Sequence, residues 1–101
     1  MIKHIVAFRF KDGISESKVK SILEEQGEFP KRFPKMRHWT MGKNISKRDD
    51  TFTYAFVVEF ESEKDLTDYL NSEEHESWVR DKWRPFIEKR AIVSYEFTGK
   101  L

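Results

Sequence analysis

Hydrophobic and polar positions follow a two-residue period in four segments of the chain. Residues 2–10 carry apolar side chains in both phases of that period, which is typical of a strand buried on both faces. Residues 51–61 alternate most clearly, with an aromatic residue or valine at most positions of one phase. Residues 36–44 and 91–97 predict two further strands.

Two helical regions separate these strands. A serine cap predicts a helix over residues 15–26, and a second serine predicts one over residues 62–70. Ser72 then restarts the helix, and Pro85 is expected to kink it because proline lacks a backbone donor. An apolar stripe follows helical spacing beyond the restart. It consists of Trp78, Val79, Trp83, Phe86 and Ile87.

The order β-α-β-β-α-β predicts a ferredoxin-like α+β fold, an antiparallel sheet with helices on one face. The loop before residue 51 is too short for a parallel crossover. Two helices cover only one face of a sheet, whereas residues 2–10 and 51–61 are apolar in both phases. We therefore expect a homodimer that packs sheet against sheet as a dimeric α+β barrel. Residues 1–101 are expected to form a single domain.

Composition excludes several classes of function. Nineteen basic and eighteen acidic residues give a net charge of +1, so no overall field recruits nucleic acid or an anionic membrane. The absence of cysteine excludes disulfides and thiol nucleophiles. No apolar run approaches the ~18 residues of a membrane-spanning helix, and a signal peptide is not expected. We expect a cytoplasmic protein that binds neither nucleic acid nor a membrane. The sequence has no phosphate-binding loop and no dinucleotide fingerprint, so no cofactor is expected.

Tyr69 and His75 lie six positions apart across the predicted helix break. The positive end of a helix disfavours a charged imidazole, so His75 would be neutral and able to accept a proton. Three neighbouring glutamates have the opposite effect, because they favour the charged form. Tyr69 can donate a hydrogen bond to a carbonyl oxygen that gains charge. Structural roles are favoured for both residues: His75 would bond a backbone group at the start of the helix, and the ring of Tyr69 would belong to the core.

Four further residues are candidates for the lining of a small apolar ligand pocket between sheet and helices. These are His4, Tyr54, Phe56 and Trp78. A lone histidine on an apolar strand face is more often a satisfied core group. Trp78 could stack on an aromatic ligand, belong to the core, or fill the cavity itself. His4 and His75 have no third ligand at a local spacing, so no metal site is expected.

Several short motifs, in their order and spacing, resemble the Dabb family, or stress-responsive A/B barrel domains. They are found at residues 2–6, 10–13, 42–44, 54–62, 69–70, 75 and 84–85 and in the closing strand. The resemblance covers nearly the whole chain. It implies a ferredoxin-like monomer and a dimer whose two sheets form a barrel. Most members of the family have no assigned reaction.

One enzyme of this family is a plant polyketide cyclase, which closes a linear tetraketide by aldol condensation. Its catalytic tyrosine and histidine correspond to Tyr69 and His75, and a pocket histidine corresponds to His4. At several pocket positions, this chain has a different type of residue from the cyclase. They are Leu23 and Gln26, which replace aromatic residues of an alkyl pocket, Tyr54, which replaces a histidine, and residues 76–78. The departures argue against the same substrate.

Four hypotheses of function follow. The first is a dimeric Dabb-type domain that binds a small apolar or carbonyl-containing ligand. The second is a cofactor-free cyclase, lyase or isomerase for a β-carbonyl compound, with His75 as base and Tyr69 as hydrogen-bond donor. The third is a cofactor-free monooxygenase or a haem-binding dimer with His4 or His75 as axial ligand. The fourth is a stress-associated dimer that is not an enzyme and whose cavity is only a by-product of packing.

Overall fold

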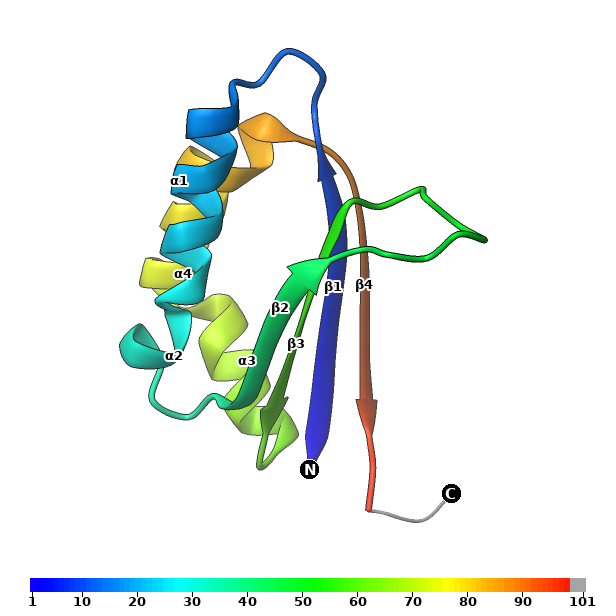
Figure 1. Cartoon of the computed structure of the whole chain (residues 1–101). Helices are drawn as coiled ribbons and strands as arrows, with labels where there is room; N and C mark the ends of the chain where they lie inside the picture. Colours follow the sequence, from blue (N-terminus) through cyan, green and yellow to red (C-terminus); the bar gives the residue numbers. More distant parts are fainter. Residues whose placement is uncertain (99–101) are drawn as a thin grey trace.

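Four antiparallel strands form one sheet, and the helices pack on one of its faces (Figure 1). This computed structural model describes residues 1–98. The strands are β1 (Ile2–Phe10), β2 (Arg37–Lys43), β3 (Tyr54–Phe60) and β4 (Ile87–Glu96), in the sheet order β2-β3-β1-β4. This is the ferredoxin-like α+β fold, and the sequence-based prediction of it is confirmed.

Serine side chains begin three of the four α-helices. The helices are α1 (Glu16–Gly27), α2 (Phe29–Arg32), α3 (Glu63–Asn71) and α4 (Glu73–Trp78). The hydroxyl groups of Ser15, Ser62 and Ser72 each accept a hydrogen bond from the backbone N–H three residues later. The short α2 is not predicted from the sequence, because Pro30 suggests a break. In the structure, Pro30 lies in the first turn of α2, where proline is tolerated. Within residues 1–98, no helix has the length and apolar character needed to cross a membrane.

The connection between α4 and β4 differs from the prediction. The chain continues from α4 through a π-helical turn (Val79–Trp83) and a 3₁₀ turn (Arg84–Phe86), and β4 begins at Ile87. Ile87 therefore belongs to the sheet, and the expectation that it ends a helical stripe is wrong. β4 also begins before the predicted start at residue 91. Pro85 accounts for the change because it cannot donate the backbone hydrogen bond that a continuing α-helix requires.

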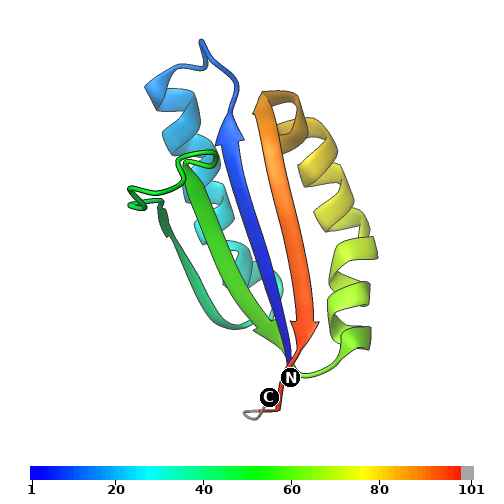
Figure 2. The same cartoon turned by 90° about the vertical axis from the view of Figure 1, so that its right-hand side faces the viewer.

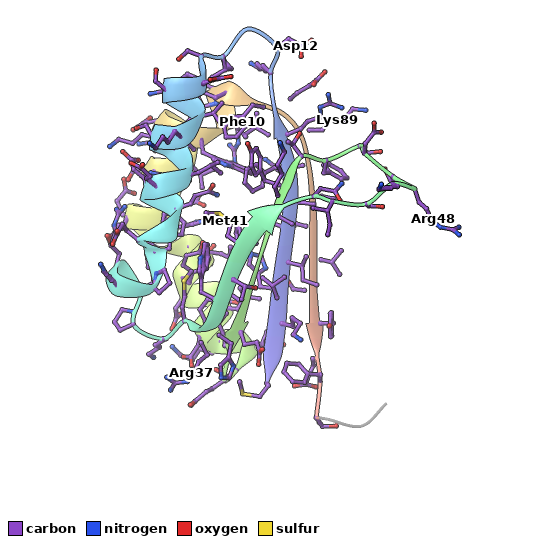
Figure 3. All side chains as sticks on the ribbon, viewed as in Figure 1. Phe10, Asp12, Arg37, Met41, Arg48 and Lys89 are labelled. Carbon is purple, nitrogen blue, oxygen red and sulfur yellow. The ribbon has the colours of Figure 1, made fainter. Side chains whose placement is uncertain are left out.

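The core lies between the sheet and the helices. Alternate residues of β1 point into it, and the register pairs Val6 with Phe56 of β3. Phe10 and Met41 also point from the sheet toward the helices (Figure 3). The ring of Trp83 meets Phe8 edge to face at 5.4 Å, which joins the last helical region to the sheet. Besides these residues, the buried apolar core includes Ile2, Ile22, Phe29, Met36, Val58, Phe60, Leu66, Tyr69 and Trp78.

No helix within residues 1–98 covers the opposite face of the sheet (Figure 2). The registers of β3, β1 and β4 place small apolar side chains in the middle of this face. They are Ala55 and Val57 of β3, Ile5 and Ala7 of β1, and Ala91 and Val93 of β4. In one chain, β1 is therefore buried only on the helix side, and Val93 remains 56% exposed.

Candidate functional site

A cavity of about 190 Å³ lies between the sheet and the last helical region. Its lining includes five of the six residues that the sequence suggests for the site. These are His4, Phe56, Tyr69, His75 and Trp78. Sites for drug-sized ligands usually measure about 300–1,000 Å³, so this cavity suits a smaller molecule.

Tyr54 is the predicted lining residue that the structure places outside the cavity. It does share a sheet face with Phe56, as the alternation predicts. Its ring, however, stacks on Phe8 at 5.8 Å, and Phe8 in turn contacts Trp83, which forms part of the cavity wall. Two aromatic side chains thus separate Tyr54 from the cavity, and its prediction as a ligand contact is corrected.

Trp78 forms a wall of the cavity without filling it. Its indole N–H donates a hydrogen bond of 2.6 Å to the carboxylate of Glu25. Its ring also meets Phe29 edge to face, with 4.9 Å between the ring centroids. These two contacts hold the indole against α1 and α2, which leaves the space beside it open.

Ser72 connects the end of α3 to the beginning of α4. Its hydroxyl donates a hydrogen bond of 2.9 Å to the carbonyl oxygen of Tyr69 and accepts one of 3.2 Å from the N–H of His75. The N–H of Ser72 donates a further bond of 3.2 Å to the same Tyr69 carbonyl. One residue therefore fixes the two backbone positions that carry Tyr69 and His75.

The ring of His75 is held in one tautomer by the backbone. Its Nδ1 lies 3.1 Å from the carbonyl oxygen of Leu70, and because a carbonyl can only accept, Nδ1 carries the proton. Burial lowers the pKa of His75 below its usual value of 6.5, although the Leu70 carbonyl and Glu76 oppose the effect. The neutral ring thus keeps a lone pair on Nε2, which can accept a proton.

Tyr69 lies against the His75 ring, with 4.4 Å between the ring centroids. It is only 5% exposed, and burial raises the pKa of its hydroxyl well above 10. The phenol therefore stays protonated at neutral pH. Within residues 1–98 the hydroxyl has no hydrogen-bond partner, so it is available as a donor.

His4 lies on the sheet side of the cavity. Its Nδ1 is 2.7 Å from the hydroxyl oxygen of Ser94, and its ring centroid is 6.4 Å from that of Tyr69. Burial, and secondarily the charge of His75, lowers the pKa of His4 to about 4. His4 is therefore neutral at pH 7 and can make hydrogen bonds inside the cavity without carrying charge.

Several polar residues of the cavity are missed by the sequence analysis. Gln26 is noted only as a departure from a related enzyme, and Trp83 only as part of an apolar stripe. Arg84 and Arg90 also line the cavity, and Ser94 holds His4. The positions of Arg90 and Ser94 follow from the pairing of β4 with β1, and the sequence does not indicate this register.

We predict that Ser72→Ala lowers the free energy of unfolding by about 1 kcal/mol, because a helix N-cap is lost. Ser62→Ala is the matched control, since Ser62 caps α3 through the N–H of Asp65 and does not line the cavity. Urea unfolding should give similar losses for the two variants. Only Ser72→Ala should alter the ¹⁵N NMR shifts of the His75 ring, and unchanged shifts would show that Ser72 does not position it.

Burial of neutral His4 predicts a loss of stability in acid. Its pKa is about 4 in the fold and about 6.5 in an unfolded chain, so only the unfolded state binds the proton between these values. Stability is therefore retained above pH 6.5 and falls as the pH decreases, by up to about 3 kcal/mol near pH 4. Denaturant titrations across this range should show a weaker pH dependence for His4→Asn. Identical slopes in both proteins would contradict the assignment.

The family model described as "Stress responsive A/B Barrel Domain" (Dabb) matches residues 2–97. Olivetolic acid cyclase of Cannabis sativa is 28% identical over 96 residues, which represent 93% of this chain and 94% of that protein. Two solved structures share the fold. A Dabb family protein from Mesorhizobium loti has a TM-score of 0.85 and 26% identity, with 97% of each chain covered. Hydroxynitrile lyase from Passiflora edulis has a TM-score of 0.88 and 24% identity, with 99% of this chain and 95% of that chain covered.

Further solved structures with this fold are described as dimeric ferredoxin-like proteins. Their similarity extends over 95% of this chain in each case. The family model matches nearly the whole sequence. This match agrees with the order of the sequence motifs and with the observed fold. The chain therefore belongs to the stress-responsive A/B barrel domain family.

Proposed function

We propose that this protein is a homodimer that performs cofactor-free acid–base chemistry on a small carbonyl compound bound in the cavity. The observation that carries the proposal is the hydrogen bond between His75 Nδ1 and the Leu70 carbonyl. This bond leaves Nε2 as the basic nitrogen, and the Tyr69 ring lies beside the His75 ring. The relationship to olivetolic acid cyclase supports a reaction at a carbonyl group.

In this mechanism, His75 removes a proton from the carbon next to the substrate carbonyl. The electron pair of the C–H bond moves toward the carbonyl oxygen, and the hydroxyl of Tyr69 donates a hydrogen bond to the oxygen as negative charge develops there. The resulting enolate either attacks a second carbonyl, as in a cyclase, or regains a proton at another position, as in an isomerase. The pKa shifts of both residues favour this chemistry, because they keep His75 neutral and Tyr69 protonated.

We predict that His75→Ala and Tyr69→Phe each reduce proton removal by about 10²-fold or more, since each removes a group used in the transition state. Deuterium uptake from D₂O at the α-carbon of small alkyl and aryl ketones, followed by NMR, measures this step without knowledge of the natural substrate. Because burial lowers the pKa of His75, the wild-type rate should fall in acid with a midpoint below pH 6.5.

The matched control for these variants is His38→Ala. His38 is 71% exposed at its side chain, pairs with Glu59 and does not line the cavity. The control should retain the wild-type rate of exchange. Equal rates in wild type, His75→Ala and Tyr69→Phe would contradict the proposed mechanism.

A sheet-to-sheet homodimer is supported by the uncovered apolar face of the sheet. Ile5 lies between Val57 and Val93 on this face, where exposed valine and isoleucine side chains are unfavourable in water. Similar proteins are described as dimeric. The helices lie on the other face, so this mode of pairing leaves the cavity outside the interface.

We predict that wild-type protein has the mass of two chains in light scattering at micromolar concentration, and that Val93→Lys shifts it toward one chain. A lysine on the buried face would place a charge between the two sheets. Ile92→Lys is the matched control, because the neighbouring Ile92 is 53% exposed but points to the helix side of β4. A monomeric wild type, or equal effects of the two lysines, would contradict the proposed interface.

The other hypotheses receive less support from the site. A cavity of about 190 Å³ is too small for a haem macrocycle, and within residues 1–98 no three carboxylate or histidine side chains group together as metal ligands. The hypothesis of a dimer with a non-functional cavity does not explain the orientation of His75 or the free hydroxyl of Tyr69. Acid–base chemistry gives both features a role.

A further inference from the structure

Two polar side chains that line the cavity are buried without a partner. Gln26 is 1% exposed and Trp83 is 5% exposed, yet the side-chain oxygen Oε1 of Gln26 and the indole Nε1 of Trp83 make no hydrogen bond within residues 1–98. Both residues belong to the cavity lining. Each such group costs about 1–3 kcal/mol of stability, which a ligand can recover by supplying the missing partner.

The chemistry of these two groups restricts that ligand. An indole N–H only donates, whereas the amide oxygen of Gln26 only accepts. A ligand hydroxyl both donates and accepts, so it can satisfy either group, while a carbonyl could satisfy only the indole.

Two exposed arginines of the cavity lining have no anionic partner among the described residues. Arg84 and Arg90 both line the cavity, and within residues 1–98 neither guanidinium makes an ion pair or hydrogen bond. Glu76 is the one acidic residue of the lining, and it lies 3.7 Å from His75. The lining therefore holds two positive charges against one negative charge.

Most other arginines of this chain find a carboxylate. Arg48, at the tip of the loop between β2 and β3, is the exception. The paired arginines are Arg9, Arg32, Arg37 and Arg80. A guanidinium binds a carboxylate through two parallel hydrogen bonds, which makes a ligand carboxylate the natural partner of Arg84 and Arg90.

We propose that the cavity binds a small hydroxy acid that is polar at both ends, with its carboxylate at Arg84 and Arg90 and its hydroxyl at Gln26 and Trp83. Apolar side chains of the lining, such as Phe56, suit a short hydrocarbon body. The inference rests on the proposed function, because it identifies the substrate or product class of the same site. Aldol addition fits this class: the enolate carbon bonds to a second carbonyl carbon, and that carbonyl oxygen takes up a proton to become a hydroxyl.

Calorimetric titration with three matched probes tests the proposal. Para-hydroxybenzoate carries both polar ends, benzoate lacks the hydroxyl, and phenol lacks the carboxylate. The dimeric wild type should bind para-hydroxybenzoate about tenfold or more tightly than either other probe, since a hydrogen bond worth about 1.4 kcal/mol corresponds to a factor of ten. Equal affinities for the three probes, or no binding at millimolar concentration, would overturn the proposal.

Conservative variants assign each end of the ligand. Trp83→Phe keeps the aromatic body without the N–H, and should weaken para-hydroxybenzoate by about tenfold while leaving benzoate unchanged. Arg90→Gln should weaken both carboxylates by about tenfold or more and leave phenol unchanged. A uniform loss for all three probes in either variant would indicate damage to the cavity and contradict the assignment of that end.

Gln26→Leu separates ligand binding from a structural role. The variant should abolish the preference for the hydroxyl and keep or raise the melting temperature, because an unpaired buried polar group is removed. A lowered melting temperature would show that Gln26 bonds an internal water for the sake of the fold, and would overturn its assignment to the ligand.

The hydroxy acid proposal and the acid–base mechanism can be rejected separately. Probe binding needs no proton removal, and deuterium uptake by simple ketones needs no carboxylate. Selective binding of para-hydroxybenzoate by the wild type, together with no deuterium exchange catalysed by the wild type, would reject the acid–base mechanism alone. Normal exchange with unselective probes would reject the hydroxy acid alone.

Discussion

The candidate site depends on the helix break that Ser72 maintains between α3 and α4. In a continuous α-helix, residues six positions apart are separated by about 240° around the axis and about 9 Å along it, so Tyr69 and His75 would face different surroundings. The break instead brings their ring centroids to 4.4 Å. The hydroxyl of Ser72 bonds one residue on each side of the break, and the bond from His75 to the Leu70 carbonyl closes the same turn. Local backbone chemistry therefore creates the pair.

Burial by the sheet then determines which protons the site holds. His75 and His4 lose much of their hydration in the cavity wall, and this lowers both pKa values, while the same cause raises the pKa of Tyr69. Two neutral imidazoles and one protonated phenol are the result at pH 7. Of the three glutamates near His75 in sequence, only Glu76 contributes to the pKa of His75. Burial, which lowers this pKa, outweighs the opposing effect of Glu76.

Local sequence patterns predict those parts of the structure that depend on neighbouring residues. Alternation correctly assigns the helix-facing side of β1, and with it His4, and the serine at position 72 correctly marks the helix break. Properties that depend on long-range packing are not predicted. The exclusion of Tyr54 from the cavity follows from how Phe8 and Trp83 meet, and the inclusion of Arg90 follows from the register of β4. Neither contact has a signal at short range in the sequence.

The register of β4 links the proposed site to the proposed dimer. Arg90 and Ile92 point to the cavity side of this strand, whereas Ala91 and Val93 face the uncovered side of the sheet. Because successive side chains of a strand alternate between faces, a shift of one residue would move the arginine out of the cavity and bring it to the apolar face. In the proposed complex, the pairing of β4 with β1 would therefore be constrained twice, by the proposed ligand on one face and by the proposed second chain on the other. The 3₁₀ turn that contains Pro85 ends the helical region immediately before the strand begins, and the strand enters its register with β1 through an irregularity between Ile87 and Lys89.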